Sequence, residues 1–319
     1  MAFAMRLALG GDTMMGRKVV DRLRQAGPES VFASEVVEAA RAADLMIVNL
    51  ECCIAEDGAP APGRVFHFRA PPVAAEALAH LGVDCVTLAN NHALDYGPEA
   101  LPDTLEHLRA AGIRAVGAGA NQASARGSLA LEANGERLRV VAFSDHPAEY
   151  AAQPDRAGIA HADLLRRKLP DWLLESVRPT EGEPVLVCPH WGPNLAPVPV
   201  PEVRRAAEAL TGAGAALIAG HSAHVFHGVA GRVLFDLGDF VDDYRVDPRL
   251  RNDLGLLWFV DIRGSEPVRI EALPLKLDYC HTRVAQGQDR EWIKARFLRA
   301  CADLGTYAEE RNGRLVIEP

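Results

Sequence analysis

The chain has 319 residues, of which 49% are hydrophobic and 24% are charged, and its formal net charge at pH 7 is −9. This length and composition are typical of a soluble globular protein with a sizeable buried core. The acidic balance argues against unaided binding to nucleic acid or to an acidic membrane surface.

The N-terminal residues do not have the pattern of a signal peptide, because Asp12 interrupts the apolar run too early. No later stretch reaches the roughly 18 apolar residues that a membrane-spanning helix needs. We therefore expect a cytoplasmic protein, or one whose export signal lies outside this sequence. The six cysteines show no CxxC spacing and are expected to be reduced and buried.

Up to residue 116 the pattern alternates apolar strands with helices. In chain order we expect a strand at 6–11, helices at 17–26 and 35–43, a strand at 45–50, a helix at 73–81, a strand at 84–88, a helix at 98–111 and a strand at 113–116. The alternating segment Arg64–Arg69 (RVFHFR) follows a loop rich in Gly and Pro and suits an exposed strand or a lid.

The middle of the chain begins with a predicted hairpin, because Asn134-Gly135 favours a tight primed turn. In chain order we then expect paired strands at 128–132 and 138–143, a helix at 163–177, a strand at 185–188, a helix at 202–210 and a strand at 215–219. The remainder changes to strands at 233–237, 254–262 and 268–275, followed by a helix at 289–302 and a polar tail.

This order of elements predicts an α/β fold, with β–α alternation in the first two-thirds and antiparallel strands after it. A mixed pair of sheets flanked by helices fits the pattern best. Since no repeat, low-complexity segment or linker divides the sequence, we expect one domain over residues 1–319. Its core is expected at about 6–275, with a C-terminal helical appendage at 288–319.

Side chains able to bind a metal or move a proton follow many of these strands within a residue or two. They are Asp12, Asn49, Glu51, Asn90, Asn91, His92, His190, His221 and His224. Any one of them has a simpler explanation as a turn former or a hydrogen-bonded surface residue. In sheets whose strands alternate with helices, however, ligands collect beyond the carboxyl ends of the strands, so we expect the set to share one pocket.

Carboxylates, an amide oxygen and imidazoles together suit a borderline divalent cation such as Mn²⁺, Fe²⁺ or Zn²⁺. A carboxylate can also bridge two such ions, and Glu51 is placed to do so. We therefore predict one or two divalent metal ions as the cofactor.

The same residues lie in short motifs that carry a family resemblance. The motifs are GGDTMMGR (10–17), NLE (49–51), LANNHALDYG (88–97), GAGAN (117–121), HWG (190–192), GHSAH (220–224) and DLGDF (236–240). Over about residues 6–243 they resemble the CapA family, proteins associated with poly-γ-glutamate capsule synthesis and built on the calcineurin-like metallophosphatase fold. The resemblance implies a metallophosphatase-like αββα sandwich, in which two mixed β-sheets are flanked by helices.

The resemblance also implies a role for each position that matches the family's motifs. The implied metal ligands are Asp12, Glu51, Asn91, His190, His221 and His224. One site would hold Asn91, His190 and His221, the other would hold Asp12 and His224, and Glu51 would bridge them. Met14 stands where many phosphoesterases carry a further histidine, which leaves the Asp12 site poorer in ligands.

The expected catalytic residues are His92, as the acid/base histidine, and Asp95, which would orient a histidine. Arg17 is expected to grip a substrate carboxylate or phosphate, since a guanidinium fork fits either group. Asn49, which would also support Glu51, and Trp191 are expected to contact substrate. The remaining histidines, among them His227, are expected to be surface or packing residues, and Cys52 and Cys53 are expected to pack.

Three functions are compatible with this pattern. The favoured one is a soluble metalloenzyme that epimerises or hydrolyses a small peptide or γ-glutamyl substrate, with neither nucleic acid nor a membrane as partner. The second is a metal-dependent phosphoesterase, which Met14 and the Glu at position 51 disfavour. The third is a non-catalytic accessory protein in polymer synthesis, which the retained set of metal ligands disfavours.

Overall fold

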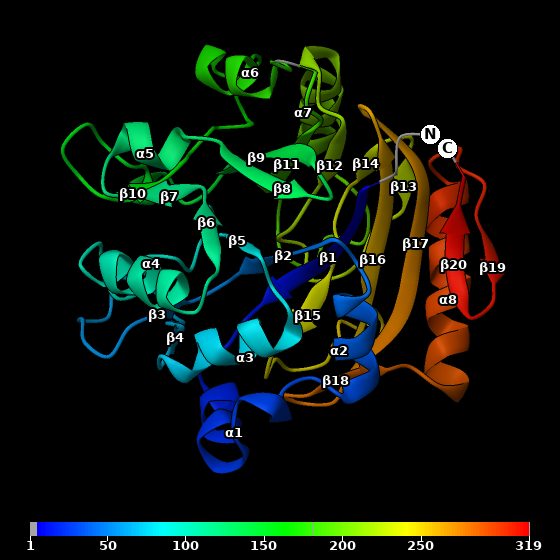
Figure 1. Cartoon of the computed structure of the whole chain (residues 1–319), viewed down its shortest axis with the longest axis horizontal. Coiled ribbons are helices and arrows are strands. Elements are labelled where there is room, and N and C mark those ends of the chain that lie inside the picture. The colour runs from blue at the N-terminus through cyan, green and yellow to red at the C-terminus, as the bar shows by residue number, and fades with distance from the viewer. Residues whose placement is uncertain (1–4, 181, 319) are drawn as a thin grey trace.

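A computed structural model of the chain describes residues 5–180 and 182–318. Two mixed β-sheets lie face to face, and helices cover the outer face of each sheet (Figure 1). The predicted αββα sandwich is therefore confirmed.

The larger sheet joins the beginning of the chain to its end. Its strand order is β19 (Glu309–Arg311), β20 (Arg314–Ile317), β17 (Glu266–Leu277), β16 (Leu254–Arg263), β1 (Met5–Thr13), β2 (Leu45–Leu50), β5 (Cys85–Thr87) and β6 (Arg114–Val116). The strands from β1 to β6 run parallel, and those from β16 to β19 are antiparallel. Two short strands, β15 (Asp239–Val241) and β18 (Thr282–Val284), pair with β1 and β17.

The smaller sheet has the order β13 (Val229–Ala230), β14 (Val233–Leu234), β12 (Leu217–Ala219), β11 (Val185–His190), β9 (Glu136–Ser144) and β8 (Leu129–Ala133). Its four inner strands are parallel, and an antiparallel hairpin closes each edge. The hairpin predicted at Asn134-Gly135 is confirmed, and both residues have the positive φ that a type I′ turn requires, 54° and 79°.

Helices cover both outer faces of the sandwich. On the larger sheet lie α1 (Lys18–Ala26), α2 (Ser34–Arg41), α3 (Val73–Leu81) and α4 (Ala100–Ala110), and on the smaller sheet lie α6 (Asp171–Val177) and α7 (Pro201–Ala213). The short helix α5 (Gln122–Arg126) lies beside the small pair β7 (Ala118–Gly119) and β10 (Gly158–Ile159). Another small pair, β3 (Cys53–Ile54) and β4 (Arg69–Ala70), lies next to α4.

Alternation of side chains along the strands sorts the core into layers. In β1, Leu7 and Leu9 join the apolar layer between the sheets, where they meet Leu186 and Leu217 of the smaller sheet. Ala8 faces the opposite way, toward the helices on the larger sheet. This period-2 pattern fixes the register, because a slip of one residue would turn the buried face to solvent.

The C-terminal helix α8 (Gly287–Ala302) packs against β13, β16 and β17, where it contributes Ile293 and Phe297 to the layer between the sheets. The segment after α8, expected as a polar tail, instead forms the hairpin β19–β20, which extends the larger sheet. Among the described residues, no helix is long and apolar enough to cross a membrane.

Two other predicted elements differ from the structure. The helix predicted at 163–177 covers only Asp171–Val177, because Pro170 disfavours helical geometry in the residue before it. The alternating segment Arg64–Arg69 does not form the exposed strand that its pattern suggested and contributes only Arg69 to the short strand β4. It remains an extended loop beside the carboxyl ends of the strands.

Candidate metal centre

The predicted ligand side chains come from strands of both sheets and meet at one end of the sandwich. Asp12 lies near the end of β1, Glu51 directly follows β2, and His190 ends β11. His221 and His224 lie in the loop after β12, and a β-bridge joins His190 to His221. All five residues are buried, so the sheets that face each other bring these groups together away from solvent.

Asp12 is the residue around which the other groups gather. Its Oδ1 lies 3.3 Å from His221 Nδ1, and its Oδ2 lies 3.4 Å from His224 Nδ1. The amide of Asn49 donates to Oδ1 at 2.7 Å, and the backbone N–H of Ser222 donates to Oδ2 at 3.2 Å. These contacts hold the Asp12 carboxylate in one orientation.

Several buried polar atoms of the predicted ligands and of Asp239 have no hydrogen-bond partner among the residues that the structure describes. They are Glu51 Oε1, Asn91 Oδ1, His190 Nε2, His221 Nδ1 and Asp239 Oδ2. A buried polar atom without a partner costs free energy, and native structures rarely tolerate several together. His190 Nε2 and Glu51 Oε1 are only 3.8 Å apart, and Tyr244 donates to the other oxygen of Glu51 at 3.4 Å. The unpaired atoms fit a cation that would take them as ligands.

Two sets of three ligand atoms satisfy the spacing of a metal site, since the atoms within each set lie within 4.8 Å of one another. One set is Asp12, Glu51 and His190, and the other is Asp12, His224 and Asp239. Carboxylate oxygens with imidazole nitrogens suit Mn²⁺, Fe²⁺ or Zn²⁺. The donors present therefore fit one or two divalent ions.

The pKa shifts reflect how many charges are buried together. Burial, followed by a neighbouring carboxylate, raises the pKa of Glu51 and of Asp239 well above the usual value. Burial alone would raise the pKa of Asp12, but the histidines around it hold the pKa of this carboxyl below its usual range. Burial lowers the pKa of His190. Burial also acts to lower the pKa of His224, but the nearby carboxylates of Glu51 and Asp12 raise it above its usual value. Such crowding of like charges is typical of a site that binds a cation.

The sequence did not identify Asp239 as a candidate ligand. Its strand β15 pairs in parallel with β1, which places Asp239 directly opposite Asp12, and its Oδ1 accepts from His224 Nδ1 at 2.8 Å. The only signal in the sequence was the DLGDF motif, which by itself indicates no role for this residue. Asp12 is the residue that the two sets of possible metal ligands share. The bridging role expected for Glu51, and the grouping of Asn91 with His190 and His221 in one site, stay predictions.

The predicted catalytic pair His92 and Asp95 lies beside the cluster, because the Phe68 ring lies near both His92 and Tyr244, and the Tyr244 ring packs against His224. His92 Nδ1 is 2.6 Å from Asp95 Oδ2, and the Phe68 ring packs against the imidazole with 4.1 Å between centroids and a tilt of 32°. Asp95 also accepts from the Phe68 backbone N–H at 2.8 Å and from the Tyr150 hydroxyl at 3.2 Å. Arg64 lies 3.9 Å from the same carboxylate. Asp95 is thus fixed from several sides and orients His92.

Arg17, predicted to grip substrate, lies at the edge of the same region. Its Nε is 3.1 Å from Asp243 Oδ2, and its guanidinium lies 5.7 Å from the ring centroids of Phe66 and Phe68. The side chain is 39% exposed, so it remains accessible to a ligand. The Phe68 ring therefore lies near both Arg17 and the predicted catalytic histidine, His92.

Asn49 is buried behind the metal-ligand cluster, where its amide is fully engaged. It donates to Asp12, and its oxygen accepts from Thr87 at 2.9 Å and from Asn90 at 3.1 Å. This network supports Asp12 and leaves no atom for the predicted substrate contact.

Trp191 lies in the core rather than in the pocket. It is 2% exposed, its indole N–H donates to the Phe235 carbonyl at 2.9 Å, and its ring packs edge-on against Phe143. The structure therefore does not support the predicted contact with substrate, and Trp191 instead anchors the segment that follows His190.

The cysteines lie where packing was expected. All six are free and buried, and burial raises the pKa of Cys53 to about 12. A thiolate next to Glu51 is therefore disfavoured.

Comparisons with known proteins show which family and which relatives the chain resembles. Residues 6–244 match the family described as "Bacterial capsule synthesis protein PGA_cap". The chain is similar to the "Probable polyglutamine synthesis accessory protein" of Mycobacterium tuberculosis, with 31% identity over 296 residues, 86% of this chain and 77% of that protein. It is also 29% identical over 242 residues to the "PGA biosynthesis protein CapA" of Bacillus subtilis, across 73% of this chain and 62% of that protein.

Among solved structures, a hypothetical protein from Thermus thermophilus matches with a TM-score of 0.53 and 19% identity, over 86% of this chain and 100% of that chain. A 5′-nucleotidase precursor from the same organism matches with a TM-score of 0.44 and 15% identity, over 86% of this chain and 55% of that chain. The first likeness shows the fold alone.

Proposed function

The chain belongs to the PGA_cap family of bacterial capsule synthesis proteins, as the motifs indicated, and from this premise we propose that it is a metal-dependent enzyme acting on a peptide or γ-glutamyl substrate. The reaction is acid/base chemistry next to a carbonyl group, either epimerisation at Cα or hydrolysis of the amide. Two relatives are named for polyglutamine synthesis and for PGA biosynthesis, which supports a glutamyl substrate.

The observation that carries this proposal is the position of the His92–Asp95 pair beside a cluster of unpaired, buried metal ligands. Neither half would be sufficient alone. A buried cluster of acids and histidines can serve structure only, and a His–Asp pair can be a hydrogen bond within the core. Together they provide a cation site and a proton-transfer group at the same end of the sandwich.

The residues of the pair divide the work of proton transfer. Asp95 accepts the Nδ1 hydrogen of His92 at 2.6 Å, which leaves Nε2 with the lone pair and fixes the direction of the ring. In hydrolysis, His92 Nε2 takes a proton from the attacking water and gives it to the leaving amine. In epimerisation it takes the Cα proton, and inversion then requires that water or a second acid deliver a proton to the opposite face of the carbanion. Phe68 covers the imidazole and limits access of bulk water.

Binding and charge stabilisation come from the groups around the pair. Asp12, Glu51, His190, His224 and Asp239 would hold one or two divalent ions. When bound, such an ion polarises a carbonyl oxygen and stabilises negative charge on it. Arg17, partly exposed beside the Phe68 ring, would hold a substrate carboxylate through its guanidinium fork.

Two alternatives remain to be separated by experiment. A metal-dependent phosphoesterase uses the same kinds of ligands, and Arg17 suits a phosphate as well as a carboxylate. A non-catalytic accessory protein is favoured by the name of the mycobacterial relative. A non-catalytic accessory protein does not require the His92–Asp95 pair. Catalysis that depends on this pair would therefore distinguish an enzyme from an accessory protein.

The test uses purified protein loaded with Mn²⁺, Fe²⁺ or Zn²⁺ and assayed with γ-glutamyl peptides in D₂O and with an aryl phosphate. Deuterium at Cα without cleavage indicates epimerisation, and release of amino acids indicates hydrolysis. Cleavage of the aryl phosphate at a faster rate than any change in the peptides would replace the proposal with the phosphoesterase. Absence of every reaction in protein with bound metal would leave the accessory role.

A further inference from the structure

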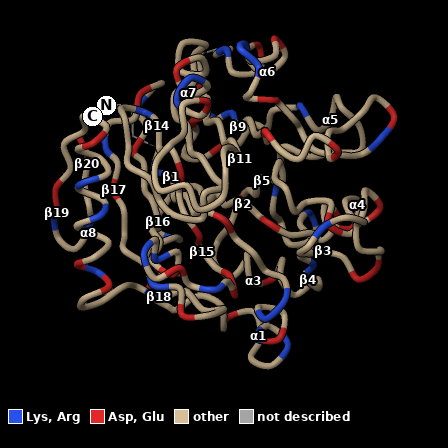
Figure 2. Tube along the Cα trace, turned by 180° about the vertical axis from the view of Figure 1, so that it is seen from behind, with Lys and Arg blue, Asp and Glu red and all other residues tan. Residues whose placement is uncertain are grey.

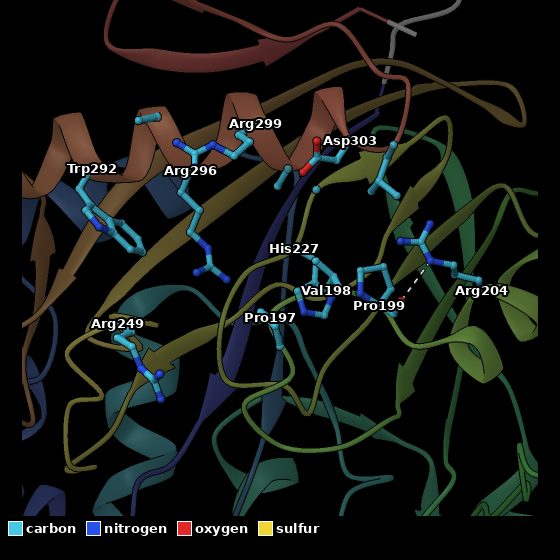
Figure 3. Close-up of a pocket in the computed structure, with 14 residues that line it drawn as sticks. Pro197, Val198, Pro199, Arg204, His227, Arg249, Trp292, Arg296, Arg299 and Asp303 are labelled. Atoms are coloured by element: carbon cyan, nitrogen blue, oxygen red, sulfur yellow. Dashed lines mark hydrogen bonds between the residues drawn. The ribbon is translucent and has the colours of Figure 1, made fainter.

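A cavity of about 440 Å³ lies between α8, α7 and the loops next to them (Figure 3). Its volume falls within the range of small-ligand pockets. Its walls are formed by Trp292, Arg296 and Arg299 of α8, Arg204 of α7, the prolines at 197 and 199, His227 and Arg249. The lining contains none of the candidate metal ligands, so this pocket is separate from the metal centre.

The pocket is basic although the protein is acidic. Four arginines line it against a single acid, Asp303, whereas the whole chain has a net charge of −9. Basic residues recur along α8, which supplies two of the four (Figure 2). A local charge opposite to the net charge of the molecule attracts and concentrates anions.

None of the four arginines makes an ion pair with a carboxylate in the part of the chain that the structure describes, although Asp236 acts on Arg296 and Asp247 on Arg249 at longer range. Arg204 donates to the Pro199 carbonyl at 3.1 Å, and Arg296 makes only long contacts, of 3.3 and 3.4 Å, to carbonyls. Arg249 and Arg299 make neither an ion pair nor a side-chain hydrogen bond with the described residues. By contrast, Arg290, on the same helix α8, is paired with Glu310.

Arg296 is the residue that gains most from a bound anion. It is half-buried, it lies over the rings of Phe226 and Trp292, and burial lowers its pKa. Removing a guanidinium from water without a carboxylate costs free energy, which an anion in the pocket would recover. His227 beside it donates through Nε2–H to the Ala196 carbonyl at 2.8 Å and lies buried in the wall.

The arrangement of the arginines indicates what kind of anion fits. They come from α8, α7 and the loop that holds Arg249, and their guanidinium groups are spread around the pocket instead of converging on one point (Figure 3). A compact anion would contact one or two of them. An extended ligand with several separated carboxylates would reach more, while Trp292 and the prolines pack against its apolar parts.

We propose that this pocket binds a segment of an acidic peptide through carboxylates on successive side chains. The site goes beyond the proposed function, since it is separate from the metal centre. Only the choice of glutamate as the acidic residue rests on the proposed function. In this role the pocket would hold a distant part of a glutamyl chain while another part is at the metal centre.

The test is calorimetric titration of the full-length, metal-loaded protein with γ-linked pentaglutamate, with pentaglutamine and inorganic phosphate as comparison ligands. Pentaglutamate should bind, and its affinity should fall as salt is raised, because the contacts are charged. The double variant Arg249→Glu/Arg299→Glu should weaken binding by about tenfold or more. Both side chains are exposed and unpaired among the described residues, so the fold should be retained. The matched control is Arg263→Glu, an exposed arginine at the end of β16, which should leave the affinity unchanged.

The outcomes separate this inference from the proposed function. His190→Ala should remove metal and turnover but retain pentaglutamate binding, and the double variant should retain metal. A pentaglutamate affinity that does not fall in the double variant would overturn the pocket assignment, because binding near Arg17 would then account for it. Three other results would overturn the assignment as well. They are an affinity for pentaglutamine equal to that for pentaglutamate, equally strong binding of phosphate that depends on the same arginines, and a loss of pentaglutamate affinity in Arg263→Glu as large as in the double variant.

Discussion

Asp12 and Asp239 lie opposite each other on paired strands, and Glu51 lies close to Asp12 in one of the two metal-like sets. Three buried carboxylates at this distance repel one another, and burial removes the water that would screen them. Nearby histidines compensate part of this cost. The free energy stored in the cluster is what a divalent cation would release on binding.

The first prediction concerns Asp239. Replacing Asp239 with Asn removes one charge from the cluster but keeps an oxygen to accept from His224. The metal-free variant should be more stable than the metal-free wild type by about 1 kcal/mol, because repulsion falls. Its affinity for Mn²⁺ or Zn²⁺ should be lower. Chemical denaturation with and without metal measures both effects, and a variant that is less stable in both states would contradict the repulsion between these acids.

The second prediction concerns His92. His92→Ala should retain bound metal and lose turnover by about 100-fold or more, the usual size of an acid/base contribution. The reason is that His92 lies beside the ligands and is hydrogen-bonded to Asp95, not to a ligand carboxylate. His107→Ala, on α4, is the matched control and should change neither property. Loss of metal from His92→Ala would place this histidine among the ligands.

The third prediction concerns His227. Burial, with help from Arg296 and Arg204, lowers its pKa from 6.5 to about 4. Between these values the unfolded chain binds more protons at this site than the folded chain does, so the free energy of unfolding falls as pH falls. From pH 7.5 to pH 5 the contribution is roughly 2 kcal/mol.

His227→Gln can preserve the donor to the Ala196 carbonyl and removes the titration. The variant should therefore lose roughly 2 kcal/mol less stability than the wild type between pH 7.5 and pH 5. Urea denaturation at the two pH values measures the difference. Parallel losses in the two proteins would show that His227 does not titrate differently in the folded state.

At the scale of elements, the centre depends on how closely β15 approaches β1. The ladder between β1 and β2 shifts register between Gly10 and Asp12, and Asp12 N–H bonds to the Gly238 carbonyl at 2.9 Å. A Cβ atom at Gly11 would lie only 1.8 Å from that carbonyl oxygen. The glycine therefore permits the strand contact that places Asp239 opposite Asp12.

The fourth prediction tests this contact. Gly11→Ala should force β15 away from β1, lower stability by about 3 kcal/mol and weaken metal binding, because overpacking beside backbone atoms cannot be relieved by a rotamer change. The matched control is Gly212→Ala in α7, where an added Cβ meets nothing within 4 Å. That variant should be more stable by up to about 1 kcal/mol. Thermal unfolding and metal titration distinguish the two, and normal metal binding by Gly11→Ala would contradict the proposed dependence on β15.

At the scale of the whole molecule, local sequence signals were sufficient for the layers of the fold. Apolar runs that end in polar residues, with helices between them, predicted the parallel strands β1, β2, β5, β11 and β12. Because ligand-type residues followed those strands, their meeting at one end could also be expected. Local signals failed where a proline or a pairing at the edge of the sheet decides the structure. The helix predicted at 163–177 begins only after Pro170, and the segment expected as a polar tail forms the hairpin β19–β20 because it pairs with β17.

The residues that sequence reasoning misjudged depend on contacts between distant segments. Asp239 becomes a candidate ligand only because β15 pairs with β1, more than 200 residues earlier in the chain. Trp191 follows β11 and Asn49 lies within β2, as the other candidates follow or lie in strands. Contacts with neighbouring segments nevertheless place both side chains in the interior. Nothing in the residues beside them in sequence indicates this direction.

We expect side chains at the ends of the strands to bind a divalent metal ion together. The metal content of the purified protein is the most direct test of this binding. Protein purified without chelator and reloaded with Mn²⁺, Fe²⁺ or Zn²⁺ is dialysed and analysed by mass spectrometry, in parallel with Glu51→Gln and His190→Ala. The wild type should retain one or two equivalents of metal per chain, and both variants should retain much less. Wild-type protein that holds no more metal than the two variants would contradict a metal centre at this end of the sandwich.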